Sequence, residues 1–525
     1  MSPVSRFETV LVLVAAIMVL RQLAFLLRLQ PASALIVGGA VLAFVPGMPR
    51  IRLDPDLILV LFLPPLLVSS AYYASWPEFR RNVGGILLLA VGAVAFTTLC
   101  VGAAVHLALP NLPWAACFAL GAVVSPPDAV AAKAVLEGLP LPRRLVALLE
   151  GESLLNDAAG IVLFRFAVAA ALFGGFRPAA ALGTFVLLAV VGIAVGVAVG
   201  AAVLFLMRRL RDREMVVLLT LMMPWVSYIG AERCGGSGVI AAVCSGLVAG
   251  WFQHSSFQAE HRRAATFVWS VVTALLEALV FVLIGLSLRA VFDTLDAAAL
   301  DRLLLPTALA VAAVVLSRFA WVGGSHLLRP ILLRLLHRDA LPRSAGEAVV
   351  LGWAGMRGVV TLAVALSVPV SMPGRDLILL VAFAVILVTV LVQGSTLGPI
   401  IRRLGIRRGS EDDTLDLGQA GALLAAAQLR VVEARAHDPD GTLRHPRLLE
   451  QYGYVAGIRS RFGAERESML AGRDAHHRIV LEAVTAGREE VLRLHRAGRI
   501  HDEVVHALEL ELDLQQINSE RALRS

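Results

Sequence analysis

The first four hundred residues of the chain consist of long apolar runs separated by short polar stretches. Hydrophobic residues make up 58% of the sequence and charged residues only 17%, and the mean hydropathy is +0.77. About 20 apolar residues in a helix cross the hydrocarbon core of a bilayer. A water-soluble fold has no interior large enough to bury so much apolar surface. The pattern therefore predicts an all-α polytopic membrane protein.

We predict about thirteen membrane-spanning helices from these runs. Their approximate ranges are 8–28, 32–48, 55–75, 83–108, 113–136, 145–174, 180–207, 215–231, 236–253, 265–291, 303–328, 345–368 and 376–401. Arginines concentrate in alternate loops, for example at Arg80/Arg81 and Arg143/Arg144. By the positive-inside rule these loops and the C-terminus lie in the cytoplasm. We expect a multi-pass protein of the cell membrane, the inner membrane in a bacterium, in contact with lipid.

The net charge of +7 follows from these inside loops. It therefore indicates membrane topology, and we expect no nucleic-acid partner. The four cysteines, Cys100, Cys117, Cys234 and Cys244, lie in or beside apolar spans without ligand-like spacing. This spacing argues against disulfide and zinc roles. The sequence contains no phosphate-binding loop and no redox motif, so we expect no cofactor.

The composition changes after Arg408. Residues 409–525 are polar, and helical apolar spacing recurs near 416–436, 446–470, 472–497 and 500–515. We predict a membrane domain over residues 1–408 and a small cytoplasmic helical domain over 409–525. Seven of the twelve histidines belong to the second domain. They either sense pH in a regulatory domain or are solvated surface residues.

The clearest functional signal is a polar cluster inside the predicted span 145–174. Glu152, Ser153, Asn156 and Asp157 interrupt an otherwise apolar segment. An ionisable group within a span costs about 2.5–3.5 kcal/mol on insertion scales, so it is rarely kept without a partner or a task. Helical spacing places Ser153, Asn156 and Asp157 on one face and turns Glu152 about 140° away from Asp157. One face thus offers oxygen ligands beside a titratable acid, and Glu152 offers a carboxylate to a neighbouring helix.

A second signal is a pair of prolines in the preceding span. Pro126 and Pro127 remove two backbone donors and interrupt the helix, and Asp128 follows directly. Broken backbone at membrane depth lines cavities, and its free carbonyls coordinate cations in transporters. Lys133, the single lysine of the chain, comes next. We interpret it as a snorkelling side chain or a countercharge to Asp128.

Arg357 lies between glycines in the predicted span 345–368. A permanently charged guanidinium there needs a carboxylate, and Glu152 is the first candidate. Glu232, Glu277 and Arg318 are further charges within spans. Each of these three either pairs structurally between helices or takes part in transport.

Taken together, these segments resemble the monovalent cation:proton antiporter family, which includes NhaP-type bacterial Na⁺/H⁺ antiporters and the animal sodium/proton exchangers. The resemblance extends in order over residues 8–405 and is carried by four motifs: Leu63–Leu67 (Leu-Pro-Pro-Leu-Leu), Gly151–Asp157 (Gly-Glu-Ser-Leu-Leu-Asn-Asp), Ala231-Glu232 with Ser237–Ala241, and Gly355–Val360 (Gly-Met-Arg-Gly-Val-Val). It implies a homodimer in which each subunit contains inverted repeats and broken helices. It also implies that a mobile core domain carries the cation past a scaffold domain in an elevator-like motion.

The resemblance also implies roles for individual residues. Asp157 becomes the shared cation- and proton-binding carboxylate, with Asn156 and Ser153 supporting it, so that Asp157 and Ser153 contact the monovalent cation. Glu152 and Arg357 become a structural charge pair. The family often has Thr-Asp-Pro at the broken helix, whereas here Pro127 precedes Asp128, which leaves main-chain oxygens as ligands at this point.

A second departure concerns Ser69 and Ser70, which stand where many relatives place an acid after the paired prolines. The auxiliary carboxylate of those relatives is absent from this position, and the sequence leaves open whether another carboxylate assists the site. Asp157 holds either a proton or a cation, and this competition implies antiport driven by ion gradients. We expect Na⁺ as the cation, with K⁺ and Li⁺ open, and electroneutral exchange.

Two other classes stay open at this point. A cation channel also places acids in a pore, but channels usually repeat a filter around an axis. An intramembrane hydrolase needs a nucleophile and a base on facing helices. Ser153 has no membrane histidine beside it in sequence, and His106, His254 and His326 are not placed by the sequence.

Overall fold

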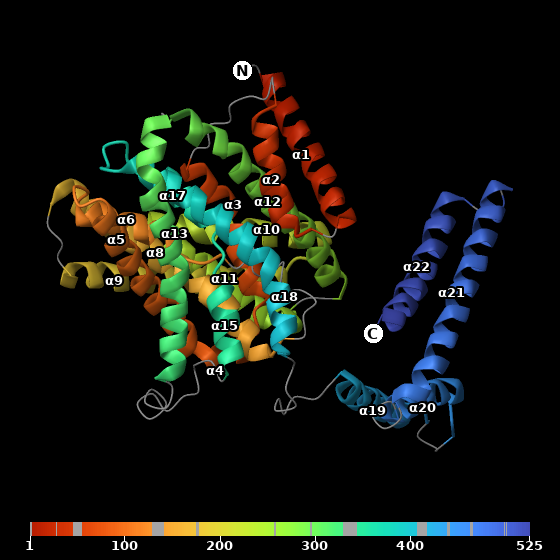
Figure 1. Ribbon diagram of the computed structural model, residues 1–525. Coiled ribbons are helices and arrows are strands. Elements are labelled where there is room, and N and C mark those ends of the chain that lie inside the picture. The colour runs from red at the N-terminus through yellow and green to blue at the C-terminus, as the bar shows by residue number, and fades with distance from the viewer. Residues whose placement is uncertain are drawn as a thin grey trace. The chain divides into compact units, whose positions relative to one another are not determined.

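The computed structural model describes residues 3–27, 29–45, 55–128, 141–174, 178–256, 259–294, 297–328, 344–406, 417–437, 442–461, 466–497, 499 and 501–524. Among these residues the regular secondary structure is helical, apart from one isolated antiparallel bridge between His437 and Leu443. The chain forms two compact units, Met1–Arg408 and Gly409–Ser525. The prediction of an all-α protein is confirmed for the described residues (Figure 1).

The first unit contains most of the helices. In chain order they are α1 (Pro3–Leu26), α2 (Pro31–Ala43), α3 (Pro55–Tyr73), α4 (Trp76–Leu87), the π-helical η1 (Leu88–Ala93), α5 (Val94–Ala108), α6 (Trp114–Val124), α8 (Arg143–Phe173), α9 (Pro178–Met207), α10 (Arg213–Arg233), α11 (Gly238–Ser256), α12 (Ala259–Thr294), α13 (Ala297–Leu327), α15 (Ala345–Trp353), α16 (Val359–Leu366), α17 (Arg375–Val388), the π-helical η2 (Thr389–Gly394) and α18 (Ser395–Leu404). Within the described residues, seven helices are long and apolar enough to cross a membrane, by length and composition.

Two predicted spans are interrupted. α6 ends at Val124, and the backbone from Ser125 to Asp128 is not helical, as the two prolines predict. Lys133 lies outside the described residues. The prediction of one continuous helix over 345–368 is wrong. α15 ends at Trp353, residues 354–358 are not helical, and α16 begins at Val359. Arg357 therefore lies in a break and not within a helix.

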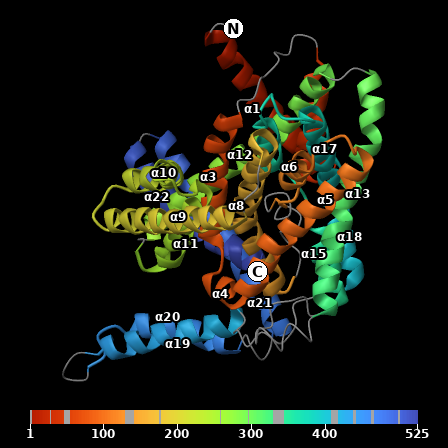
Figure 2. The ribbon, with the colours of Figure 1, turned by 90° about the vertical axis from the view of Figure 1, so that its left-hand side faces the viewer.

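The helices of the first unit pack in two groups. The α12 group contains α1, α2, α3, α9, α10, α11 and α12, with α2 packed along α12 and α11 packed on α3, α9 and α10. The α8 group contains α4, α5, α6, α8, α13, α15, α16, α17 and α18, with α6 between α5 and α8 and with α13 against α5, α15 and α17. Figure 2 shows α9, α10 and α11 on one side of this unit and α13, α15 and α18 on the other.

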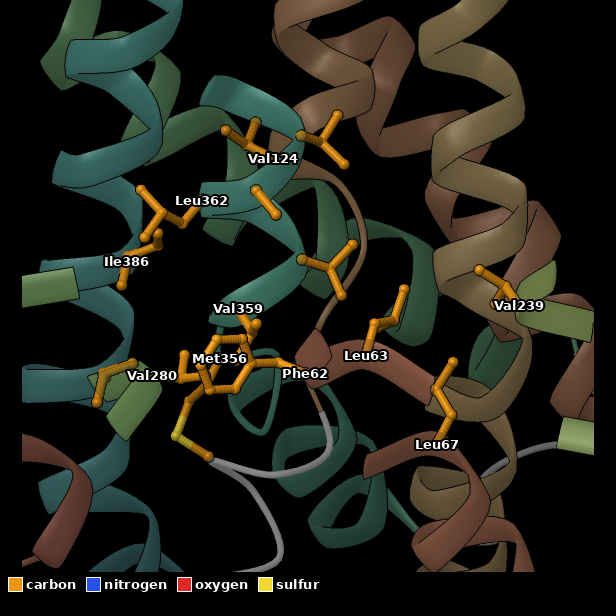
Figure 3. Close-up of a cluster of buried hydrophobic side chains, with 14 of the residues drawn as sticks. Phe62, Leu63, Leu67, Val124, Val239, Val280, Met356, Val359, Leu362 and Ile386 are labelled. Atoms are coloured by element: carbon orange, nitrogen blue, oxygen red, sulfur yellow. The ribbon is translucent and has the colours of Figure 1, made fainter. Parts of the chain in front are cut away.

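The two groups meet along an apolar boundary. α16 packs on α3 and α12, and α8 packs on α3 and α11. Figure 3 shows part of the buried cluster at this boundary, with Phe62 and Val280 from the α12 group and Met356 and Val359 from the α8 group. Apolar packing of this kind is non-directional, so it holds the groups together without fixing one register between them.

The second unit contains four helices: α19 (Leu417–Arg435), α20 (Pro446–Arg461), α21 (Arg466–Arg496) and α22 (Asp502–Arg524). α19 packs on α20, and α21 packs on α22 in a helical hairpin (Figure 1). An ion pair joins the hairpin, with Arg488 Nη2 2.6 Å from Asp513 Oδ1. Four helices lie where the sequence predicts them, but three bounds differ. α20 ends at Arg461 instead of near 470, α21 begins at Arg466 instead of near 472, and α22 extends to Arg524 instead of ending near 515.

A truncation tests whether the second unit takes part in transport. Every predicted ion ligand precedes Arg402, so we expect a chain ending at Arg408 to keep cation-dependent proton flux, with changes limited to its pH dependence or expression level. The measurement is flux in proteoliposomes across a pH series, with the full-length protein as the control. Loss of all flux in a truncated protein that elutes as a single species would contradict this expectation.

Candidate functional site

The polar face of α8 lies against the break after α6. Asn156 Nδ2 donates a hydrogen bond of 2.5 Å to the carbonyl oxygen of Pro127. Gly160 allows this contact, because a side chain at that position would collide with the Pro126 ring. Asn156 is fully buried. The amide of Asn156 is thus in direct contact with a main-chain oxygen that the break after α6 leaves free.

The contact uses the amide nitrogen of Asn156 and leaves its amide oxygen as a possible ligand. Asn156 Oδ1 is buried and has no hydrogen-bond partner among the described residues. Asp157 is buried too, and its charge and that of Asp128 repel each other. Asp157 makes no hydrogen bond or ion pair to the described part of the chain. An unpaired amide oxygen and an unpaired carboxylate in a buried site are oxygen ligands that a hard cation can use.

Asp128 connects the first break to the second. Its backbone N–H donates to Met356 O at 2.6 Å, and its Oδ2 accepts from the Val359 N–H at 3.2 Å. Val359 is the first residue of α16, so the carboxylate lies at the positive end of this half-helix. Gly358 makes room for it, because a side chain there would collide with the Asp128 carboxylate.

Arg357 occupies the reciprocal position. Its Nε donates to Val124 O at 3.0 Å and its Nη2 to Ser125 O at 3.3 Å, and Nη1 donates to Gly355 O. Val124 is the last residue of α6, so the guanidinium lies at the negative end of that half-helix. The Arg357 backbone N–H donates to Thr389 Oγ1 at 3.0 Å, which ties the break to η2.

The direct partner of Glu152 is Arg318 and not Arg357 as predicted, although the charges of Glu152 and Arg357 still attract each other. Glu152 forms a bidentate ion pair with Arg318 of α13, with Oε1–Nη1 at 2.5 Å and Oε2–Nη2 at 2.8 Å. Arg318 Nε also donates to Leu351 O, near the end of α15, at 3.0 Å. Carbonyls at the end of α6 provide the acceptors for Arg357, so its guanidinium does not need Glu152 as a direct partner.

Sequence reasoning missed this role of Arg318 and the break in the second span. Pairing between helices is one of the two roles that the sequence allows for Arg318, but spacing along one chain does not say which carboxylate a given arginine reaches. The break had a signal in the glycines at 352, 355 and 358. Gly355 is required by packing, because a side chain there would collide with Arg318.

The fold and the site define a class of protein. The chain is a multi-pass helical membrane protein in which two interrupted helices meet beside buried acids, an arrangement found in secondary transporters. A family model described as "Sodium/hydrogen exchanger, transmembrane" matches residues 10–403. The chain therefore belongs to the sodium/hydrogen exchanger family, whose activity is exchange of a cation for a proton rather than enzymatic conversion.

Individual relatives agree with this family. The chain is 32% identical to an uncharacterised Na⁺/H⁺ exchanger of Mycobacterium tuberculosis, over 97% of this chain and 95% of that protein. It is also 32% identical to a sodium, potassium, lithium and rubidium/H⁺ antiporter of Bacillus pumilus, over 75% of this chain and 61% of that protein. Its fold is similar to that of the sodium proton antiporter MjNhaP1 from Methanocaldococcus jannaschii, with a TM-score of 0.62 at 20% identity, over 78% of this chain and 100% of that one.

A double-mutant cycle tests the partner of Glu152. Removing one member of a buried ion pair typically costs about 3–5 kcal/mol, so Glu152→Gln and Arg318→Leu should each lower the melting temperature in detergent strongly. The melting temperature of the double variant should fall by much less than the sum of the two single decreases, because neither charge of the pair is then left without its partner. The matched cycle of Glu152→Gln with Arg357→Leu should be closer to additive. Stronger coupling of Glu152 to Arg357 than to Arg318 would contradict the ion pair.

Proposed function

We propose that this protein exchanges Na⁺ for H⁺ and that Asp157 binds each in turn. The observation that carries the proposal is the contact between Asn156 and Pro127, which leaves Asn156 Oδ1 without a partner among the described residues, one position before the buried carboxylate of Asp157. Asp157 supplies the charge that a cation needs. Asn156 and Ser153 on the same helix face, together with Pro127 O and the Asp128 carboxylate at the break, supply further oxygens.

Competition for one carboxylate produces exchange. Protonated Asp157 and cation-bound Asp157 are both electrically neutral at the carboxylate, whereas the bare carboxylate is charged. Moving a bare charge through the low-dielectric centre of the membrane is costly, so the empty site crosses slowly. The protein therefore carries a proton in one direction and a cation in the other, and the ion gradients drive the cycle.

The surrounding contacts support a site that moves as one body. Asp128 and Arg357 each bind the broken end of the other segment's helix, and Arg318 links Glu152 of α8 to the end of α15. All of these residues belong to the α8 group. Its boundary with the α12 group is apolar where Phe62 meets Met356 and Val359 (Figure 3). We therefore propose an elevator-like mechanism in which the α8 group slides against the α12 group.

The cation and the assembly are further parts of the proposal. Oxygen ligands suit Na⁺, K⁺ and Li⁺, and the Bacillus pumilus relative is named for sodium, potassium, lithium and rubidium. We propose Na⁺ as the main cation, with K⁺ and Li⁺ as weaker substrates. We further propose a homodimer in the bacterial inner membrane, with the C-terminal unit in the cytoplasm regulating the response to pH. A channel or a hydrolase is less well supported, because neither follows from the family.

The variant Asp157→Asn tests the site. It preserves the shape of the side chain and removes the titratable charge, so the protein should insert and fold but lose Na⁺-dependent proton flux by at least a hundredfold in proteoliposomes, roughly the loss of 2.7 kcal/mol of stabilisation. Asp376→Asn, the same change at an exposed carboxylate at the start of α17, is the matched control and should keep flux. Near-normal flux in Asp157→Asn would show that another group carries the ions.

Charge balance gives an independent test. Glu152 is bound to Arg318, and Asp128 is bound to the start of α16, which leaves one carboxylate to swap a proton for a cation. Exchange should therefore be electroneutral. In proteoliposomes, a valinomycin-clamped potassium diffusion potential of either sign should leave the initial rate of Na⁺-driven proton flux unchanged. A rate that follows the potential would mean that a second titratable group moves charge, with Asp128 the first to examine.

A further inference from the structure

A cavity of about 440 Å³ lies on the boundary between the two helix groups. Its walls include Leu59 and Val60 of α3, Arg165 of α8, and Tyr228 and Glu232 of α10. Arg165 follows Asp157 by eight residues, which is about 12 Å along the helix. The cavity therefore adjoins the helix that carries the ion site, at the end of the membrane domain where α10 ends.

An ion pair crosses the boundary at this cavity. Arg165 Nη2 lies 4.0 Å from Glu232 Oε2, and the two side chains are 58% and 38% exposed. Glu232 Oε1 also accepts a hydrogen bond of 3.1 Å from the Gly238 N–H at the start of α11. Glu232 is thus fixed to the α12 group, whereas Arg165 belongs to the α8 group. Arg233, on the same wall, is the other charged residue that lines the cavity.

We propose that Arg165 and Glu232 form a positioning pair that stabilises the described arrangement of the two groups and so sets the balance between the two end states of the exchanger. This inference rests on the proposed exchange by relative motion of the groups. If α8 slides past α10, the two side chains move out of contact, because one is carried by α8 and the other is held at α11. The pair then favours the end state in which the cavity next to it is formed.

The size of the effect follows from exposure. Ion pairs between exposed side chains typically contribute about 0.2–1 kcal/mol, and are weakened by salt. The pair can therefore change the population ratio of the two end states by about fivefold at most. A cation that binds only one end state has a lower apparent affinity when a smaller fraction of the protein is in that state. The shift therefore changes the KM for the cation and leaves ion binding at Asp157 itself unchanged.

The test measures the KM for Na⁺ separately from each side of the membrane, using the full chain in right-side-out and inverted vesicles. Arg165→Gln and Glu232→Gln should each raise KM about two- to fivefold from the cavity side and lower it from the other side. The charge swap Arg165→Glu with Glu232→Arg should bring both values back toward wild type. Opposite shifts in the two single variants would mean that the charges act only through the local field, and would overturn the proposal.

A matched control is available in a pair that does not cross the boundary. Arg213 Nη1 of α10 lies 3.4 Å from Glu260 Oε1 of α12, and the two side chains are 53% and 76% exposed. Both helices belong to the α12 group. Arg213→Gln and Glu260→Gln should leave both KM values unchanged. If they change the KM as much as the boundary variants do, the effect is a general one of surface charge, and the positioning role is wrong.

Ionic strength gives a second measurement, which weakens the ion pair in the wild-type protein without a substitution. Adding choline chloride should move the sided KM values of the wild-type protein in the same direction as Arg165→Gln does, and should move those of a folded Arg165→Gln protein much less. An equal response in both, or no response in the wild type, would contradict the pair. Flux that survives in Asp157→Asn would instead contradict the proposed ion site, so the two failures are distinguishable.

Discussion

The rest of the membrane domain depends on two reciprocal contacts, in which a charged residue of each broken segment binds the helix end of the other segment. Asp128, from the break after α6, lies at the start of α16, and Arg357, from the break before α16, lies at the end of α6. Each charge neutralises the partial charge of the other half-helix and accepts or donates hydrogen bonds that the interrupted backbone cannot make internally. Without both, non-helical backbone at this depth would be left with unpaired polar groups.

The other buried charges follow from this crossing. α8 reaches the first break through Asn156, and the other side of α8 is anchored by Glu152, which binds Arg318. Arg318 in turn binds Leu351 O close to the second break. Asp157 therefore lies on a helix that is held on one side by the neutral amide of Asn156 and on the other by Glu152, whose charge Arg318 compensates. It remains the one acid of this cluster that is free of a hydrogen bond or ion pair to the described residues, which suits it to bind a proton or a cation.

Much of this architecture could be predicted from the chain. The apolar runs placed the helices, the paired prolines predicted the first break, and the spacing of Ser153, Asn156 and Asp157 put three polar side chains on one face of α8. The partner of Glu152 could not be predicted, because Arg318 and Arg357 are both isolated arginines in apolar surroundings. The second break was missed because three glycines weaken a helix without requiring it to end, in contrast to proline.

By itself the sequence determined the membrane class, the approximate spans and the identity of the buried acids, because hydropathy and helical periodicity are properties of a local segment. Only the tertiary structure decided which charges meet. Arg318 reaches Glu152 across 166 positions of sequence, and Arg165 reaches Glu232 across the boundary between two helix groups. Pairing of this kind depends on how helices pack, and the approach of Arg318 to the second break requires a glycine at position 355. The physical reason is that a buried charge is stabilised by whichever partner the packing brings within hydrogen-bond distance, and that distance is not encoded in any one segment.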